Sequence, residues 1–129
     1  MLAERRTLSS GARWEPLVGY SRAVRVGDWI SVAGTTAEVV NGQPAGGTDL
    51  AEQTRSAIRR IVAALGQLGG QLSDVVRTRI FLTDIDRWQE VAKAHAEFFG
   101  EIHPATSLIG VSRLIDPEML VEIEATAVV

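Results

Sequence analysis

The C-terminal run 120–129 constrains the fold of this chain most, because its side chains alternate between two kinds. Apolar side chains occupy every second position: Val121, Ile123, Ala125 and Ala127 alternate with Leu120, Glu122, Glu124 and Thr126. Successive side chains of a β-strand point to opposite faces of a sheet, so this period of two predicts a strand. One of its faces would pack on a core, and the other would carry the carboxylates of Glu122 and Glu124.

Other segments show the same strand pattern or a helical one. Strand patterns occupy 23–26, 29–33, 75–83 and 107–111, and a short edge strand is expected near 7–9. A helix is expected to begin at Asp49, which is followed three residues later by Glu52, and to end at Gly69. A second apolar stripe at helical spacing covers 88–99 and stops at Gly100.

This order of elements predicts an α+β fold with one sheet and both helices packed on one of its faces. The other face would remain bare, although it carries large side chains such as Trp29, Phe81 and Leu120 among charged ones. A face of this kind is rarely left to water, so we expect a homo-oligomer that packs sheet against sheet. Pockets in such an assembly fall between subunits.

Composition limits the classes of partner. The 129 residues are expected to form a single domain, 1–129. The formal net charge is −3 and the basic residues are scattered, which argues against nucleic acid and anionic membranes as partners. The absence of cysteine excludes disulfides and thiolate metal sites and suits a reducing cytoplasm. The N-terminus lacks an apolar signal segment, and no apolar run is long enough to cross a membrane.

Common catalytic and cofactor motifs are missing. No serine occupies a G-x-S-x-G elbow, no histidine pair has metal-ligand spacing, and the glycines match neither the dinucleotide nor the phosphate-loop pattern. We therefore expect neither a metal nor a cofactor. His95 falls on the apolar stripe of the second helix and is interpreted as a core or interface residue. Tyr20, the only tyrosine, precedes a strand, where its phenol can reach a pocket.

Charged side chains of opposite sign recur on two of the expected strands. Arg77 and Arg79 share a face of one strand, and Glu122 and Glu124 share a face of the last. Opposite charges on neighbouring strands pair readily, which favours an ion-pair ladder at a subunit interface. Arginine also grips a carboxylate with two parallel hydrogen bonds, so an arginine here could hold an acidic ligand while a glutamate positions water. The sequence leaves both interpretations open.

Several motifs, in order along the chain, resemble the RidA/YjgF family. They are G-Y-S-R-A-V at 19–24, V-A-G at 32–34, A-E-Q-T-R at 51–55, V-V-R-T-R-I-F-L-T-D at 75–84, A-E-F-F-G at 96–100 and V-E-I-E-A-T-A-V-V at 121–129. The resemblance implies a chorismate-mutase-like fold and a homotrimer that binds a small molecule in clefts between its subunits. The best-known branch of the family implies hydrolysis of reactive enamines and imines, such as 2-aminoacrylate, to 2-keto acids and ammonia.

The resemblance also implies roles for single residues. Glu122 matches a glutamate that orients the attacking water, and Tyr20 and Gly34 match positions of the cleft. Ala33 stands where the family has a serine, and Ser107 belongs to the proline-led segment of the substrate site. These residues are therefore the expected site.

Thr106 departs from the family pattern. The family segment P-A-R-S carries an arginine that clamps the substrate carboxylate, whereas this chain reads P-A-T-S at 104–107. Threonine cannot supply a charge-assisted, two-pronged grip, in which one such hydrogen bond is worth about 1.5–3 kcal/mol. The resemblance is thus to a branch that lacks the arginine, and typical 2-aminoacrylate deaminase activity is doubtful.

Two main functions remain open. The first is a RidA-like hydrolase or deaminase of altered specificity, in which Glu122 positions water, Tyr20 and Thr106 line the cleft, and Arg79 replaces the missing arginine if its strand faces the cleft. The second is a non-catalytic trimer that binds a small metabolite or a protein partner. An older family name suggests a ribonuclease or translation inhibitor, but the acidic composition argues against it.

Overall fold

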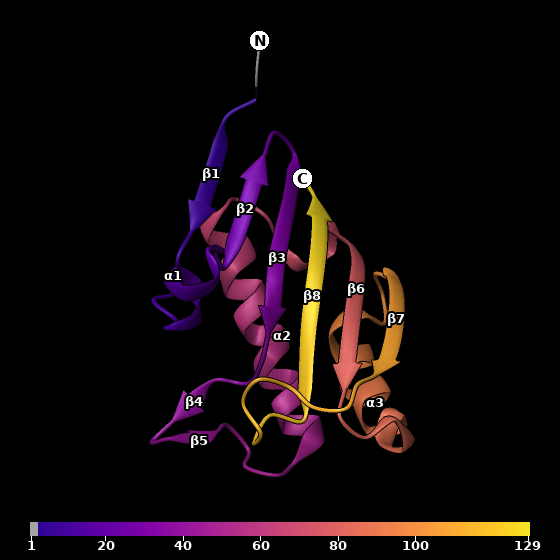
Figure 1. The fold of residues 1–129 in the computed structure, drawn as a ribbon. Helices are drawn as coiled ribbons and strands as arrows, with labels where there is room; N and C mark the ends of the chain where they lie inside the picture. Colours follow the sequence, from indigo (N-terminus) through magenta and orange to yellow (C-terminus); the bar gives the residue numbers. More distant parts are fainter. Residues whose placement is uncertain (1–2) are drawn as a thin grey trace.

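The computed structural model describes residues 3–129, which form a mixed sheet with helices on one face (Figure 1). Residues 1 and 2 of the expected domain 1–129 lie outside the described residues. Within residues 3–129, six strands pair in the order β1-β2-β3-β8-β6-β7, and the pair β6–β7 is parallel. These strands are β1 (Arg5–Leu8), β2 (Ala23–Val26), β3 (Trp29–Thr35), β6 (Val75–Leu82), β7 (Ala105–Gly110) and β8 (Val121–Val128). A small hairpin and the helices complete the fold: β4 (Val39–Val40), β5 (Gln43–Pro44), α1 (Trp14–Val18), α2 (Leu50–Gln67) and α3 (Trp88–Phe99).

The two long helices, α2 and α3, cover one face of the sheet, as the apolar stripes predict. Ile58 and Ile61 of α2 are fully buried in the same core as Ile30 of β3 and Ile80 of β6. Burying a side chain of this size contributes about 1.5–3 kcal/mol, so this layer is the main source of stability. None of the helices within residues 3–129 is long and apolar enough to cross a membrane.

Strand β8 lies in the middle of the sheet, between β3 and β6, and its alternation matches the prediction. Val121 and Ile123 are completely buried under the helices, whereas Glu122 and Glu124 are partly exposed on the opposite face. Both helices lie behind the sheet in Figure 1, so the face that carries the carboxylates is open. The expected α+β class, with a single sheet and both long helices on one side, is confirmed.

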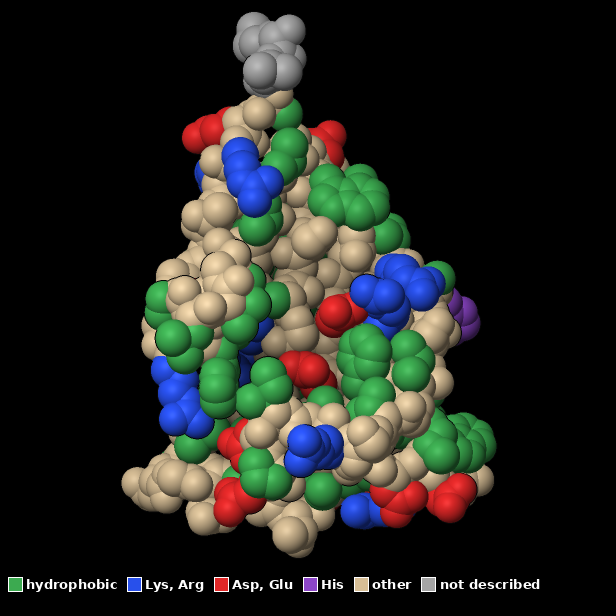
Figure 2. Space-filling model, in the orientation of Figure 1, with side chains coloured by type: hydrophobic (Ala, Val, Ile, Leu, Met, Phe, Trp, Pro, Cys, Tyr) green, Lys and Arg blue, Asp and Glu red, His purple; other side chains and the backbone are tan. Residues whose placement is uncertain are grey.

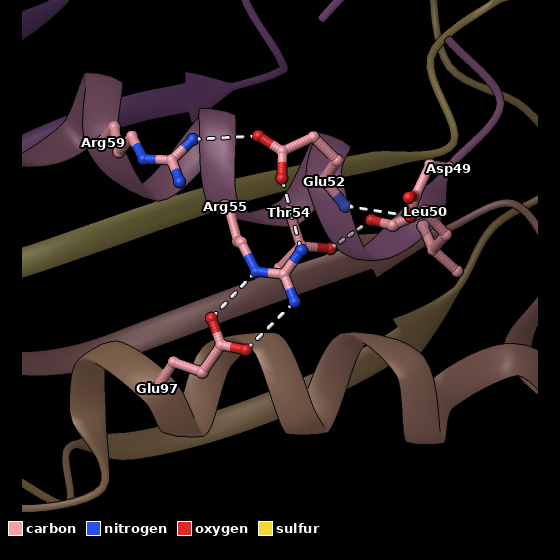
Figure 3. Close-up of polar contacts among 7 residues, drawn as sticks. All are labelled: Asp49, Leu50, Glu52, Thr54, Arg55, Arg59 and Glu97. Carbon is pink, nitrogen blue, oxygen red and sulfur yellow. Dashed lines mark hydrogen bonds and ion pairs between the residues drawn. The ribbon is translucent and has the colours of Figure 1, made fainter. Parts of the chain in front are cut away.

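Polar side chains cap the start of α2 and link this helix to α3 (Figure 3). The Asp49 carboxylate accepts a hydrogen bond from the backbone N–H of Glu52, which confirms the expected helix start. Arg55 donates two hydrogen bonds to Glu97 of α3, at 2.8 and 3.0 Å, and one to Glu52 at 3.2 Å. Arg59 also binds Glu52, at 3.0 Å. Pairs this exposed each add little stability, but together they tie the two helices.

The sequence patterns do not predict α1, since residues before 16 appear irregular in them. The buried Glu15 of α1 accepts hydrogen bonds from the Ser9 hydroxyl at 2.9 Å and from the backbone N–H of Ser10 at 3.1 Å. Gly19 then ends the helix with a φ of 87°, a conformation that favours glycine. Tyr20 follows directly, in the segment that leads into β2, and its backbone N–H donates to the Glu15 carbonyl at 3.1 Å.

Candidate functional site

The open face of the sheet is hollowed between its middle strands and the segment that leads into β2. The hollow has a volume of about 510 Å³, and its lining includes Tyr20, Ala33, Arg77, Arg79 and Glu124. Figure 2 shows acidic and basic side chains gathered around the hollowed centre of this face. The structure thus brings together three of the expected site residues, Tyr20, Ala33 and Arg79, from separate segments.

Gly34 and Glu122 meet beside this hollow, where β3 contains one residue more than the stretch of β8 that it faces. The pairs that flank this irregularity are Val32 with Ala125 and Thr35 with Ile123. Such bulges re-aim side chains and recur next to active sites. A Cβ at position 34 would lie 2.8 Å from both Cδ and Oε1 of Glu122. Glycine at this position therefore leaves room for the Glu122 carboxylate.

Burial raises the pKa of Glu122, and the charge of the neighbouring Glu124 raises it further. The Arg22 guanidinium acts in the opposite direction and keeps the rise smaller. A carboxyl group whose pKa moves toward neutrality can both accept and return a proton, which is what general acid–base chemistry needs. Glu122 is accordingly the group on this face best suited to activate water.

Arg22 is a neighbour of the site that sequence reasoning missed. Its side chain is only 7% exposed, and its Nη2 donates a hydrogen bond to the Gly34 carbonyl at 2.8 Å. The guanidinium carbon also lies 5.8 Å from the centre of the Tyr20 ring. Arg22 therefore holds the bulge that accommodates Glu122. Its place in the motif G-Y-S-R-A-V was the available signal, but a buried arginine cannot be recognised from one sequence.

Arg79 pairs with Glu124 across β6 and β8. Its Nε and Nη2 both lie 2.7 Å from Oε1 of Glu124. Arg77 instead faces Thr126, and Glu122 faces Phe81, so the register supplies one rung of the expected ion-pair ladder. Arg79 lines the hollow, but its positive charge is largely neutralised by the ion pair with Glu124.

Thr106 and Ser107 are on β7, an edge strand of the sheet, where the Ser107 hydroxyl lies 3.5 Å from Nη2 of Arg77, a residue that lines the hollow. Thr106 is paired with the buried Thr78, and Ser107 is paired with Arg79. Paired residues of neighbouring strands share a face, so Thr106 is on the helix side and Ser107 on the open side. Neither lines the hollow, and a single chain does not bring Thr106 together with Glu122.

Comparison with known proteins decides the family. Residues 10–129 match the family described as Endoribonuclease L-PSP. The chain belongs to the RidA/YjgF family. The crystal structure of a YjgF family member from Mycobacterium tuberculosis is 55% identical in sequence and superimposes with a TM-score of 0.89. The match covers 98% of this chain and 100% of that one. The resemblance seen in the sequence motifs is confirmed.

Curated relatives of this RidA/YjgF chain include proteins with and without an assigned activity. An uncharacterized protein of Streptomyces coelicolor is 38% identical over 125 residues, which cover 95% of this chain and 90% of that protein. The 3-aminoacrylate deaminase RutC of Acinetobacter baylyi is 32% identical over 112 residues, which cover 87% of this chain and 88% of the relative. Each match therefore extends over most of the length of the relative.

His95 of this RidA/YjgF chain lies between α3 and the sheet, as its place on the apolar stripe predicts. Its Nε2 is 2.9 Å from the Thr78 hydroxyl, and its ring is 4.4 Å from that of Phe99. Burial lowers the pKa of His95 to about 4, so the ring is neutral at pH 7. Among the described residues, no three His, Asp or Glu side chains are grouped so that they could hold a metal ion.

Protonation of His95 is expected to remove about 2 kcal/mol from the free energy of unfolding between pH 7 and pH 4. The pKa of His95 is about 4 in the folded protein and near 6.5 in the unfolded chain. As the pH falls, the unfolded chain therefore takes up a proton at a higher pH than the folded protein does, which stabilises the unfolded state relative to the folded one. Urea unfolding followed by circular dichroism at each pH measures the loss. His95→Gln should lack this part of it, and an unchanged pH dependence in that variant would assign the loss to other groups.

Proposed function

We propose that this protein hydrolyses an imine or enamine to a carbonyl compound and ammonia, with Glu122 as the general base. The observation that carries the proposal is the partly buried carboxyl group of Glu122, whose pKa is raised and which packs against Gly34 beside the hollow. The activity in the name of one relative, 3-aminoacrylate deaminase, supports the same class of reaction. Tyr20 and Ala33, which line the hollow, would contact the substrate.

The reaction needs only water and a group that moves protons. A water oxygen bonds to the imine carbon while Glu122 accepts a proton from that water. The electron pair of the C=N bond moves to nitrogen, which takes up a proton. The hydroxyl proton of the resulting carbinolamine then passes through Glu122 to the nitrogen, the C–N bond breaks, ammonia leaves, and the remaining oxygen forms the carbonyl group. An enamine joins this route after protonation at carbon. The raised pKa of Glu122 suits both its proton transfers.

The site is proposed to be completed by a neighbouring protomer in a homotrimer. Tyr20, Gly34 and Glu122 would come from one protomer, and Thr106 and Ser107 from β7 of the next. This division is supported by their separation within one chain, since β7 lies at the edge of the sheet. Arg79 would stay at the cleft but paired with Glu124, and so contribute a weaker anchor for an acidic ligand than an unpaired arginine would.

The open face supports this assembly, because Trp29 remains 54% exposed on it and Val26 and Val128 are exposed nearby. Light scattering from the full chain should give three times its mass of 13.9 kDa. A stable monomer would remove the cleft and, with it, the roles proposed for Thr106 and Ser107.

Ammonia release is the direct test of the proposed activity. The protein is incubated with 2-aminoacrylate and with a panel of bulkier imines, and ammonia is measured against a protein-free control. We expect release from members of the panel and little from 2-aminoacrylate, because Thr106 stands in place of the arginine. Binding of these compounds without any release would instead favour the second candidate, a non-catalytic trimer that binds a small metabolite; the missing arginine is the observation in its favour.

A further inference from the structure

A chain of hydrogen bonds leads from α3 to the hydroxyl of Thr106. Nε2 of His95 lies 2.9 Å from Oγ1 of Thr78, and that oxygen lies 2.8 Å from Oγ1 of Thr106. The Thr106 hydroxyl is also 3.2 Å from the carbonyl oxygen of Pro104. Thr78 is completely buried, whereas Thr106 is exposed at the edge of the sheet. One end of the chain is therefore fixed in the core and the other is open to a ligand.

Counting protons along this chain shows what Thr106 has to offer. If Thr78 donates its proton to His95, the short contact between the hydroxyls requires Thr106 to donate to Thr78. If His95 donates to Thr78, then Thr78 donates to Thr106, whose own proton points to the Pro104 carbonyl. In both arrangements the Thr106 proton has a partner within the protein. The part of Thr106 that remains for a ligand is a lone pair.

Neither arginine of β6 lies on the side of the sheet that Thr106 faces. Arg77 and Arg79 lie on the open face, with Ser107, and Arg79 is bound to Glu124 at 2.7 Å. His95 is neutral at pH 7, because burial lowers its pKa to about 4. A carboxylate placed against Thr106 would thus meet an acceptor oxygen, and none of Arg77, Arg79 and His95 would offer it an unpaired positive charge on that side of the sheet.

We propose that Thr106, held by Thr78, is a hydrogen-bond acceptor in the ligand site and selects compounds with an N–H or O–H donor at that end instead of a carboxylate. This inference rests on the proposed function for the position of Thr106 in the cleft. It assigns a substrate class: imines or enamines that carry an amide, amine or hydroxyl group where the substrates of arginine-containing relatives would carry an acid.

Binding of a matched pair of small probes tests the inference without any turnover. Propionamide and propionate have similar shapes, but only the amide has N–H donors. Each is titrated into the uniformly 15N-labelled protein at pH 7, and shifts of the backbone amides of β7 and β8 report binding. We expect propionamide to bind at least about fivefold more tightly than propionate, as befits one gained hydrogen bond and one avoided repulsion.

Substitutions at position 106 make the test specific. Thr106→Val keeps the shape but removes the hydroxyl, and should abolish the preference for propionamide; Thr106→Ser keeps the hydroxyl and should retain it. Thr106→Arg should reverse the preference in favour of propionate. Thr78→Val removes the hydroxyl that holds Thr106, so the Thr106 proton becomes available to a ligand. This variant should fold as wild type does but show a smaller ratio between its affinities for propionamide and propionate.

The inference fails if propionate binds wild type as tightly as propionamide, if neither probe binds, or if Thr106→Val behaves like wild type. Propionate binding that is lost in Arg79→Gln would show that Arg79 replaces the missing arginine, which also overturns it. None of these results decides whether the protein is a hydrolase, which the measurement of ammonia release tests separately. Conversely, a protein that releases no ammonia can still show the predicted preference between the two probes.

Discussion

Replacing Glu122 by glutamine should lower the rate of ammonia release by about 10²–10³-fold while the protein keeps its fold. The amide has the shape of the carboxyl group and fits against Gly34, but it cannot accept a proton from water. The comparison is of kcat for one substrate of the panel, with circular dichroism to check that the variant is folded. In wild type, kcat should fall as the pH drops through a pKa above the usual glutamate range, because protonated Glu122 is no longer a base.

Glu124→Gln is the matched control for this substitution. Glu124 lies on the same face of the same strand, but its carboxylate is bound to Arg79. Its replacement should leave most of kcat in place but move the pH profile of kcat to lower pH, because the charge of Glu124 no longer raises the pKa of Glu122. Ammonia release that survives Glu122→Gln, or an equal loss in the two variants, would show that Glu122 is not the base.

Replacing Gln53 by methionine should reduce the free energy of unfolding by about 3 kcal/mol or more, as several buried groups lose their partners. Gln53 is fully buried in α2, and its amide joins three segments. Nε2 donates to the carbonyls of Gly47 at 2.8 Å and Glu118 at 3.2 Å, and Oε1 accepts from the backbone N–H of Leu120 at 2.9 Å. Methionine fills the same space but satisfies none of these groups.

Urea unfolding at pH 7 measures this effect, with Gln67→Met as the control. Gln67 is in the same helix but is exposed, so its replacement should change stability by less than about 0.5 kcal/mol. Because Leu120 lies two residues before Glu122, Gln53→Met should also weaken ammonia release. Equal stability of the two variants would mean that backbone groups near Gln53 find other partners.

Periodicity and capping predicted most of the fold, because these signals are local. The alternation of β8 and the start of α2 at Asp49 are properties of a few neighbouring residues, and the structure confirms both. Pairing register is not local. No sequence pattern could show that Arg79 faces Glu124 while Glu122 faces Phe81, since a shift of two residues would keep every side chain on its own face and fit the same alternation.

The candidate site was predictable only in part, for the same reason. Tyr20 and Ala33 were identified through the family motifs, and the structure places both at the hollow. The buried Arg22 and the link from His95 to Thr106 each join segments far apart in the chain. Such contacts depend on the folded arrangement and leave no spacing that could be found in one sequence.

The extra residue in β3 also changes which positions of this strand face the core. Before the bulge, the even-numbered Ile30 and Val32 are buried, whereas after it the odd-numbered Thr35 is buried, as is Ala37 just beyond the end of the strand. Deleting Ala33 would restore a regular alternation in which Ile30, Val32 and Thr35 all still face inward, but it would remove the bulge that leaves room for Glu122. The bulge beside Glu122 thus allows both halves of β3 to face inward although the strand contains an extra residue, so losing that residue would change the pocket and leave the same side chains in the hydrophobic interior.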